Sequence, residues 1–364
     1  MKFKSEKDIF VEALVAASRV VSRSPGATSG ILLTLTGNAL SVTGTDLDLT
    51  TRVSLDVIGF EDGAVVVPSR LIVESTRLLD AGAVTVETND ENVVISLGRA
   101  KFSLRTFSVV DYPKLPTVPA PSTTVAALDL VQGLSQVARA SSTDEARPLL
   151  TGVLFTNENG TLRVVATDSY RLAIRDLPGV AALADHDLLV PAKAVAELQR
   201  AAASLEVESE IGVAISAAEI HFTAGASSIS SRLIDGNYPD YRQLIPAGYP
   251  NTLRIGKDTI LSSLKRVKVL AKDASSSVRL ALKASGADIA TTSLDQGNVV
   301  DNVDGDYHGD DLMIAFNPSF LMEGIEATPG DEVVLETSDS TRPAMVHGVD
   351  DVTFRYLLMP VRVQ

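Results

Sequence analysis

The sequence predicts an α+β fold made of three similar domains, each of about 120 residues. A helical pattern recurs as VPSRLIVESTRLL, VPAKAVAELQRAA and FNPSFLMEGIEAT, at residues 67–79, 190–202 and 316–328. Proline is expected at the first position of each helix (Pro68, Pro191 and Pro318), because the N–H that it lacks has no partner there. The copies are too far apart for a solenoid, whose units have about 20–50 residues. Each copy therefore belongs to a separate domain.

A second helix opens each third of the chain. The apolar spacing predicts these helices within 7–23, 128–141 and 258–272. Two helices are therefore expected in each domain, six in all.

Strands follow the opening helix in every third. Segments in which apolar and polar residues alternate predict two strands joined by a turn at 37–54, 159–176 and 286–303. Further strand patterns end the thirds at 101–115, 227–241 and 350–364. Helices bury one stripe and sheets one face, so we expect two helices packed on antiparallel sheets in each domain.

The domain boundaries are placed where proline accumulates. PKLPTVPAPST (113–123) and IPAGYPN (245–251) read as linkers. The expected domains are residues 1–119, 123–246 and 250–364.

Basic residues recur on the non-core faces of five of the six expected helices. Val195, Leu198 and Ala202 form an inward stripe, with Lys193 and Arg200 opposite. In the helix of the first repeat, the expected inward residues are Leu71, Ile72, Leu78 and Leu79. The sixth helix is the exception, since its outward positions include Glu323 and Glu326. Each face alone could be an ordinary solvated surface.

The net charge of −14 makes this distribution informative. An acidic chain should repel nucleic acid, yet its basic residues gather on helix backs. Such segregation can focus a positive field in one concavity, where Lys and Arg would contact phosphates without reading sequence.

Other classes of function find little support. The chain has no cysteine, and none of its four histidines pairs with another at metal-ligand spacing, so no cofactor and no metal site are expected. No nucleophile–base pair or phosphate-binding loop is recognisable, so no catalytic residue is assigned and the chain is not expected to be an enzyme. The absence of a long apolar run or a signal sequence leads us to expect a cytoplasmic protein without membrane contact.

Five motifs, in order along the chain, resemble the bacterial DNA polymerase III beta subunit, the sliding clamp. They are GTDLDL (44–49), RPLLTGVLF (147–155), ATDSYRLA (166–173), LIDGNYPDYRQLIP (233–246) and YLLMPVRV (356–363). The resemblance implies three clamp domains per chain and a head-to-tail homodimer that closes into a six-domain ring around double-stranded DNA. It implies a processivity factor that tethers the replicative polymerase α subunit, the clamp loader and other proteins with a clamp-binding motif. A clamp copy that acts as a decoy or resistance factor is the alternative.

The resemblance also implies two sets of contact residues. Residues expected to face DNA are Arg19, Arg23, Arg77, Arg139, Arg147, Lys193, Arg200, Lys265 and Arg266. In the dimer interface, Phe102 and Leu104 are expected to meet Val269 and Leu270, although these side chains could instead fill their own domain cores.

The family's peptide-binding groove is carried over residue by residue. It is expected to comprise Leu150, Thr167, Ser169, Tyr170, Arg171, Leu172, Pro246, Pro343, Met345, Leu357, Leu358, Met359, Pro360, Val361 and Arg362. Without the resemblance, Leu357–Val361 reads as a buried strand. The chain departs from the family pattern at two places. Gln364 extends it by one residue at the edge of this groove, and SPGATSG (24–30) lacks the proline-rich stretch common in the family, which leaves the expected DNA contact near Arg23 open.

Overall fold

The computed structural model describes residues 1–89, 91–115, 117–271, 277–293 and 297–362, so Gln364 lies outside the described residues. The chain forms two compact units. Unit 1 contains residues 1–128 and 193–233, and unit 2 contains residues 129–192 and 234–364.

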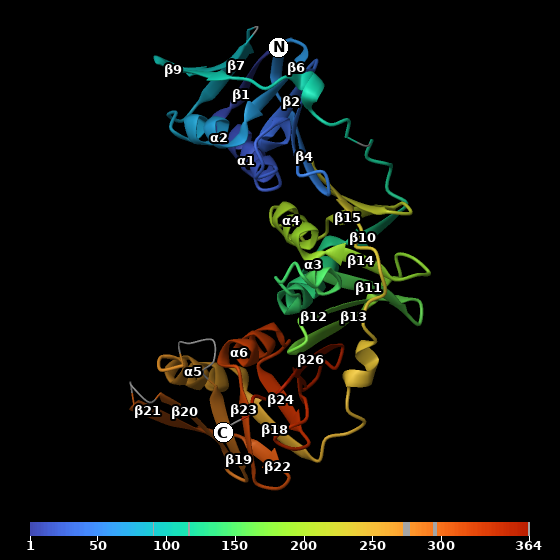
Figure 1. The fold of residues 1–364 in the computed structure, drawn as a ribbon, viewed down its shortest axis with the longest axis vertical. Coiled ribbons are helices and arrows are strands. Elements are labelled where there is room, and N and C mark those ends of the chain that lie inside the picture. Colours follow the sequence, from blue (N-terminus) through green and yellow to red (C-terminus); the bar gives the residue numbers. More distant parts are fainter. Residues whose placement is uncertain (90, 116, 272–276, 294–296, 363–364) are drawn as a thin grey trace. The chain divides into compact units, whose positions relative to one another are not determined.

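The six predicted helices are present in the described residues (Figure 1). They are α1 (Lys7–Ser18), α2 (Ser69–Arg77), α3 (Ala127–Val137), α4 (Ala192–Ala202), α5 (Lys257–Lys268) and α6 (Pro318–Ala327). Short 3₁₀ helices are η1 (Ala27–Ser29), η2 (Val109–Asp111), η3 (Ala138–Ala140), η4 (Pro148–Thr151) and η5 (Tyr241–Leu244). Two α-helices lie in each expected third, which confirms the α+β class.

Unit 1 contains two antiparallel sheets. The five-stranded sheet has the order β5 (Ile58–Glu61), β1 (Lys2–Glu6), β7 (Ala83–Thr88), β8 (Asn92–Leu97) and β9 (Ala100–Arg105). The eight-stranded sheet has the order β10 (Thr123–Ala126), β15 (Glu210–Ile215), β16 (Glu219–Ala224), β17 (Ser227–Arg232), β4 (Leu49–Asp56), β3 (Ala39–Thr45), β2 (Gly30–Thr36) and β6 (Gly63–Pro68). Helices α1 and α2 pack on each other, and α1 also packs on β3 and β4. Phe3 and Phe10 meet edge to face in the core, with ring centroids 5.6 Å apart.

Unit 2 also contains two antiparallel sheets. The nine-stranded sheet has the order β14 (Leu188–Pro191), β11 (Gly152–Glu158), β12 (Thr161–Thr167), β13 (Arg171–Ala181), β26 (Phe354–Leu358), β25 (Ala344–Gly348), β24 (Glu332–Thr337), β18 (Asn251–Gly256) and β22 (Asp306–His308). The four-stranded sheet has the order β21 (Gly297–Asp304), β20 (Gly286–Ser293), β19 (Val278–Lys283) and β23 (Leu312–Phe316). Helix α6 packs on β25 and β26.

Two strand pairings join segments from different thirds of the chain. In unit 1, β17 pairs with β4 from Ser227↔Val53 to Ser231↔Leu49. In unit 2, β13 pairs with β26 from Arg171↔Leu358 to Arg175↔Phe354. The middle third therefore contributes strands to both units, and the domain limits stay a prediction.

The structure corrects three local predictions. Pro68 and Pro191 end strands β6 and β14, one residue before their helices, and only Pro318 occupies the first helical position. Leu71 and Leu78 do not point inward, since 47% and 77% of their surface is exposed. The buried stripe of α2 runs through Ile72, Val73 and Thr76, so Leu71 lies beside it and Leu78 lies beyond the last turn.

Helix α1 ends at Ser18 rather than continuing to residue 23. The Val20 N–H donates to the Ala17 carbonyl at 3.3 Å, an i→i−3 bond that closes the last turn. No helix in the described residues is both long and apolar enough to cross a membrane.

Candidate functional site

The turn between β12 and β13 is built by its own side chains. Thr167 Oγ1 accepts the Ser169 N–H at 3.1 Å and donates to the Arg171 carbonyl at 2.6 Å. Asp168 Oδ1 accepts the N–H groups of Tyr170 and Arg171 at 2.9 and 3.0 Å. Ser169 has φ +79°, a left-handed conformation that a serine adopts only when its surroundings hold it there. The turn leaves 61% of Tyr170 exposed.

An apolar cluster follows this turn on one side of the nine-stranded sheet. It brings together three of the predicted groove residues, Leu172, Met345 and Leu357, which are buried and face one another across adjacent strands. We call this side of β13, β25 and β26, defined by these three residues, the groove face. Met359, 42% exposed, lies at its end, and its N–H donates to the Tyr170 carbonyl at 2.9 Å.

Two predicted groove residues point to the other side of the sheet. Side chains alternate along a strand, so Arg171 and Leu358, which are paired across β13 and β26, lie opposite Leu172 and Leu357. Tyr356 lies on the same side, and an added Cβ on Gly324 of α6 would overlap its ring. We call this side, defined by Arg171, Tyr356 and Leu358, the helix face.

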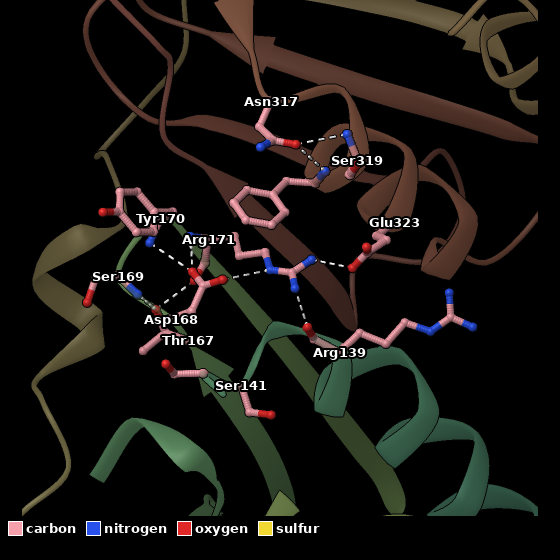
Figure 2. A network of polar contacts seen from close by, with 12 residues as sticks. Arg139, Ser141, Thr167, Asp168, Ser169, Tyr170, Arg171, Asn317, Ser319 and Glu323 are labelled. Atoms are coloured by element: carbon pink, nitrogen blue, oxygen red, sulfur yellow. Dashed lines mark hydrogen bonds and ion pairs between the residues drawn. The ribbon is translucent and has the colours of Figure 1, made fainter. Parts of the chain in front are cut away.

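The Arg171 guanidinium is enclosed by partners on the helix face. It donates from Nε to Asp168 Oδ2 at 3.0 Å, and it also donates to Glu323 and to the Arg139 carbonyl. Its Cζ lies 4.3 Å from the ring centroid of Phe320. Figure 2 shows the guanidinium between Asp168, Arg139 and Glu323, with the Tyr170 ring directed away from it. The structure thus gives Arg171 internal partners in place of a surface position.

The remaining predicted groove residues differ in exposure. Leu150 and Thr167 are buried, Pro246, Pro343 and Pro360 are half-buried, and Ser169, Val361 and Arg362 are exposed. The Val361 N–H donates to the Ala315 carbonyl at 2.7 Å, which holds the segment after β26 against β23.

The cluster contains residues that the sequence analysis did not assign. They are Leu154, Val165, Ile174, Leu189 and Tyr241, with Leu149, Ile234, Tyr238, Ile245 and Tyr249 packed around them. Ile234, Tyr238, Tyr241 and Ile245 stand in the quoted motif at 233–246, so their repeated apolar spacing was the available signal. In the described residues, the buried hydroxyls of Tyr238, Tyr241 and Tyr249 have no hydrogen-bond partner. Burial raises the pKa of Tyr249 to about 12, so this hydroxyl stays protonated.

All nine residues expected to face DNA are exposed, but six of them already form ion pairs. The pairs are Arg19–Glu197 (2.8 Å), Arg200–Glu197 (2.5 Å), Lys193–Asp46 (3.0 Å), Arg139–Glu326 (3.4 Å), Arg147–Asp144 (2.9 Å) and Arg266–Asp301 (2.5 Å). Glu197 is buried and binds two arginines at once. Within the described ranges, Arg23, Arg77 and Lys265 form no ion pair.

The same contacts account for the acidic outward side of the sixth helix. Glu323 pairs with Arg171, and Glu326, one turn later on α6, pairs with Arg139. Both carboxylates thus bind arginines from the middle third of the chain. Inside unit 2, this helix serves as the acidic partner of two basic side chains.

The four residues expected in a dimer interface lie at or near the edges of sheets. Phe102 and Leu104 belong to β9, an edge strand, and are half-buried against the core of unit 1. Val269 is 60% exposed and Leu270 half-buried, just after α5. Helix α5 packs on β21, which is an edge strand in unit 2.

Comparison with known proteins covers almost the whole chain. Family models described as the N-terminal, central and C-terminal domains of the DNA polymerase III beta subunit match residues 1–116, 124–240 and 242–362. The beta sliding clamp of Streptomyces coelicolor is 32% identical, and that of Proteus mirabilis 30%, each with complete coverage of both chains.

Solved structures agree with the sequence comparison. A sliding clamp from Bartonella birtlesii bound to griselimycin superimposes with a TM-score of 0.93 at 28% identity. A griselimycin-bound clamp from Pseudomonas aeruginosa gives 0.90 at 27% identity, and both comparisons cover all of each chain. The chain belongs to the DNA polymerase III beta subunit family, the bacterial beta sliding clamps.

Proposed function

We propose that this chain is a processivity clamp, a head-to-tail dimer whose ring of six domains encircles duplex DNA. The observation that carries the proposal is the match of three clamp domains over nearly the whole chain, combined with an apolar cluster beside exposed side chains in unit 2. Its partners are DNA, a second copy, the replicative polymerase α subunit, the clamp loader and other proteins with a clamp-binding motif. Its role needs no catalytic residue, and a cytoplasmic location stays a prediction. The alternative of a decoy copy gains no support from these matches.

The dimer joint is proposed between β9 of one copy and the α5–β21 region of the other. Edge strands offer unpaired backbone groups that can template pairing with another chain. A head-to-tail contact forms a closed ring only when its rotation closes. Phe102 and Leu104 on one side and Val269 and Leu270 on the other supply the apolar contact.

Scattering with an absolute mass in dilute buffer tests the ring. We expect twice the 38.4 kDa chain mass and the distance distribution of a hollow particle. Val269→Asp should give a monomer, whereas Val207→Asp, at another exposed apolar residue, should stay dimeric. A wild-type monomer at micromolar concentration would contradict the ring.

DNA contact is proposed at the nine exposed basic residues expected to face DNA, and the ion pairs that six of them form make that contact weak. Phosphates must compete with carboxylates for six of these side chains. Exposed ion pairs are worth only about 0–1 kcal/mol, so exchange costs little for Arg139, Arg147, Lys193 and Arg266. Arg19 and Arg200 share the buried Glu197 and are held more firmly. The ring would hold DNA by enclosure, and interchangeable weak contacts would let it slide.

Partner peptides are proposed to bind on the groove face, between Tyr170 and Met359. Apolar pockets with few polar groups suit such ligands, and methionine adapts to different side chains. Griselimycin, the ligand of two related clamps, is the probe. Met359→Ala should weaken its affinity about tenfold while stability changes by less than about 0.5 kcal/mol. Met313→Ala, which is similarly exposed on β23, is the control. Unchanged affinity of Met359→Ala would refute the groove assignment.

A further inference from the structure

Arg171 carries a buried positive charge whose main contacts lie away from the groove. Only 8% of its side chain is exposed, and Asp168 and Glu323 are its two acidic partners. A third donor reaches the Arg139 carbonyl, and Tyr356 Oη lies 3.4 Å away. These contacts, together with the Phe320 ring, occupy the guanidinium. Within the described residues these partners leave little of the side chain accessible to a peptide.

One of those contacts controls the turn beside the groove. The Asp168 carboxylate binds the Arg171 guanidinium through Oδ2 and the N–H groups of Tyr170 and Arg171 through Oδ1. A carboxylate held on one side by a guanidinium is a fixed acceptor on the other. Arg171 thus contacts the acceptor of the two N–H groups that follow Ser169, whereas Thr167 Oγ1 holds the Ser169 N–H itself.

The other acidic contact comes from α6. Glu323 binds Arg171 from the helix face, so a residue on the far side of the sheet restrains the same guanidinium (Figure 2). The next carboxylate on that helix, Glu326, reaches Arg139 instead. The two acids therefore differ in whether they hold the turn.

We propose that Arg171 is a positioning residue of the peptide groove and that Glu323, through Arg171 and Asp168, sets the conformation of the 167–171 turn. This inference rests on the proposed groove. The effect reaches the groove through the Tyr170 ring, which lies at one end of it. When Glu323 releases Arg171, the 167–171 turn becomes less ordered and the ring loses its binding position.

Paired substitutions on α6 test the inference. In the full-length protein, Glu323→Gln should weaken griselimycin binding about fivefold to tenfold. Glu326→Gln removes a charge one turn away and should change the affinity by less than about twofold, because Glu326 does not contact Arg171. Equal effects of the two variants, or no effect of Glu323→Gln, would overturn the inference.

Amide hydrogen exchange supplies a readout that global stability does not move. The Tyr170 and Arg171 N–H groups should exchange faster in Glu323→Gln, by more than the amides elsewhere in unit 2, and should exchange at wild-type rates in Glu326→Gln. Arg171→Lys should resemble Glu323→Gln in affinity, since a lysine cannot reproduce the guanidinium fork. Wild-type protein that fails to bind griselimycin would refute the groove itself. Normal wild-type binding, together with an unchanged griselimycin affinity of Glu323→Gln, would refute only the positioning role.

Discussion

The two faces of the β13–β26 pairing differ in how they are stabilised, although their residues alternate along the same strands. The groove face brings together Leu172, Met345 and Leu357, without a charge among them. The helix face encloses the Arg171 guanidinium and the Tyr356 ring beneath α6. One face depends on apolar burial and the other on satisfied polar contacts.

This difference shows that adjacent residues of one sequence motif can have separate structural roles. Arg171 and Leu172 are adjacent, but a strand directs them to opposite sides of the sheet. A family motif assigns both to one groove. The backbone directs the leucine to the groove face and the arginine to the helix face.

Removal of Arg171 should have the largest effect. Arg171→Ala leaves Asp168 and Glu323 without their cation, and loss of one partner in a buried pair costs about 3–5 kcal/mol. Urea denaturation should show this loss in the unfolding of unit 2. Arg147→Ala removes an exposed i,i+3 pair and should cost less than about 1 kcal/mol. Similar losses for the two variants would mean that the helix face does not depend on its cation.

Leu172→Ala tests the groove face by the same denaturation experiment. The side chain is buried, and truncation of a buried leucine costs about 2–5 kcal/mol through lost burial and the cavity left behind. Leu172→Met keeps the volume and should cost less than about 1.5 kcal/mol. If the methionine were as damaging as the alanine, shape rather than apolar burial would govern this face.

Gly324→Ala tests the fit of α6 on the helix face. An added Cβ would overlap the Tyr356 ring, so the helix must move and overpacking should cost about 1–3 kcal/mol. Alanine favours helix by about 1 kcal/mol, which offsets part of the loss. Thermal unfolding measures the net change, and Glu326→Ala on the same helix is the control. A Gly324→Ala protein that is more stable than the wild type would show that α6 and the Tyr356 ring can move apart at little cost.

Acid should weaken the pair between Asp351 and Arg175, whose side chain lies on the same side of β13 as Arg171 by strand alternation. Burial would raise the pKa of Asp351, but hydrogen bonds from Thr353 and the Arg175 guanidinium, 2.8 Å away, outweigh it and lower that pKa. The stabilisation is therefore present above the ordinary aspartate pKa of about 3.9 and is lost as the pH falls through the lower folded value. Asp351→Asn should cost about 1 kcal/mol at pH 7 and progressively less toward pH 3. A cost that is independent of pH would exclude this charge effect.

Much of the fold could be predicted from the sequence because its signals are local. The repeated segment and the apolar spacing predicted all six helices in the described residues. The hairpins at β3–β4, β12–β13 and β20–β21 overlap the predicted strand–turn–strand segments, but their second strands run past the predicted ends at 54, 176 and 303. The pairings β17–β4 and β13–β26 could not be predicted, since they join strands far apart in the chain and no turn specifies their register.

The site could be predicted only in part. The family resemblance pointed to Leu172, Met345 and Leu357, which the structure brings together. Strand alternation alone would have separated Arg171 from Leu172. The partners of Arg171 could not be predicted from the sequence, because Glu323 is distant in the chain and its position on the helix predicted a solvent-facing side chain.

The pairing of β4 with β17 has a consequence for synthesis. Strand β4 ends at Asp56 and β17 begins at Ser227, so roughly 170 residues separate the two partners. At about 5–20 residues per second, the ribosome needs roughly 10–30 s to supply the second strand. During that time the nascent β4–β3–β2–β6 sheet has an open edge at β4, which can pair with another emerging chain. Slower codons between these strands would lengthen that exposure and lower the yield of folded protein without changing a single amino acid.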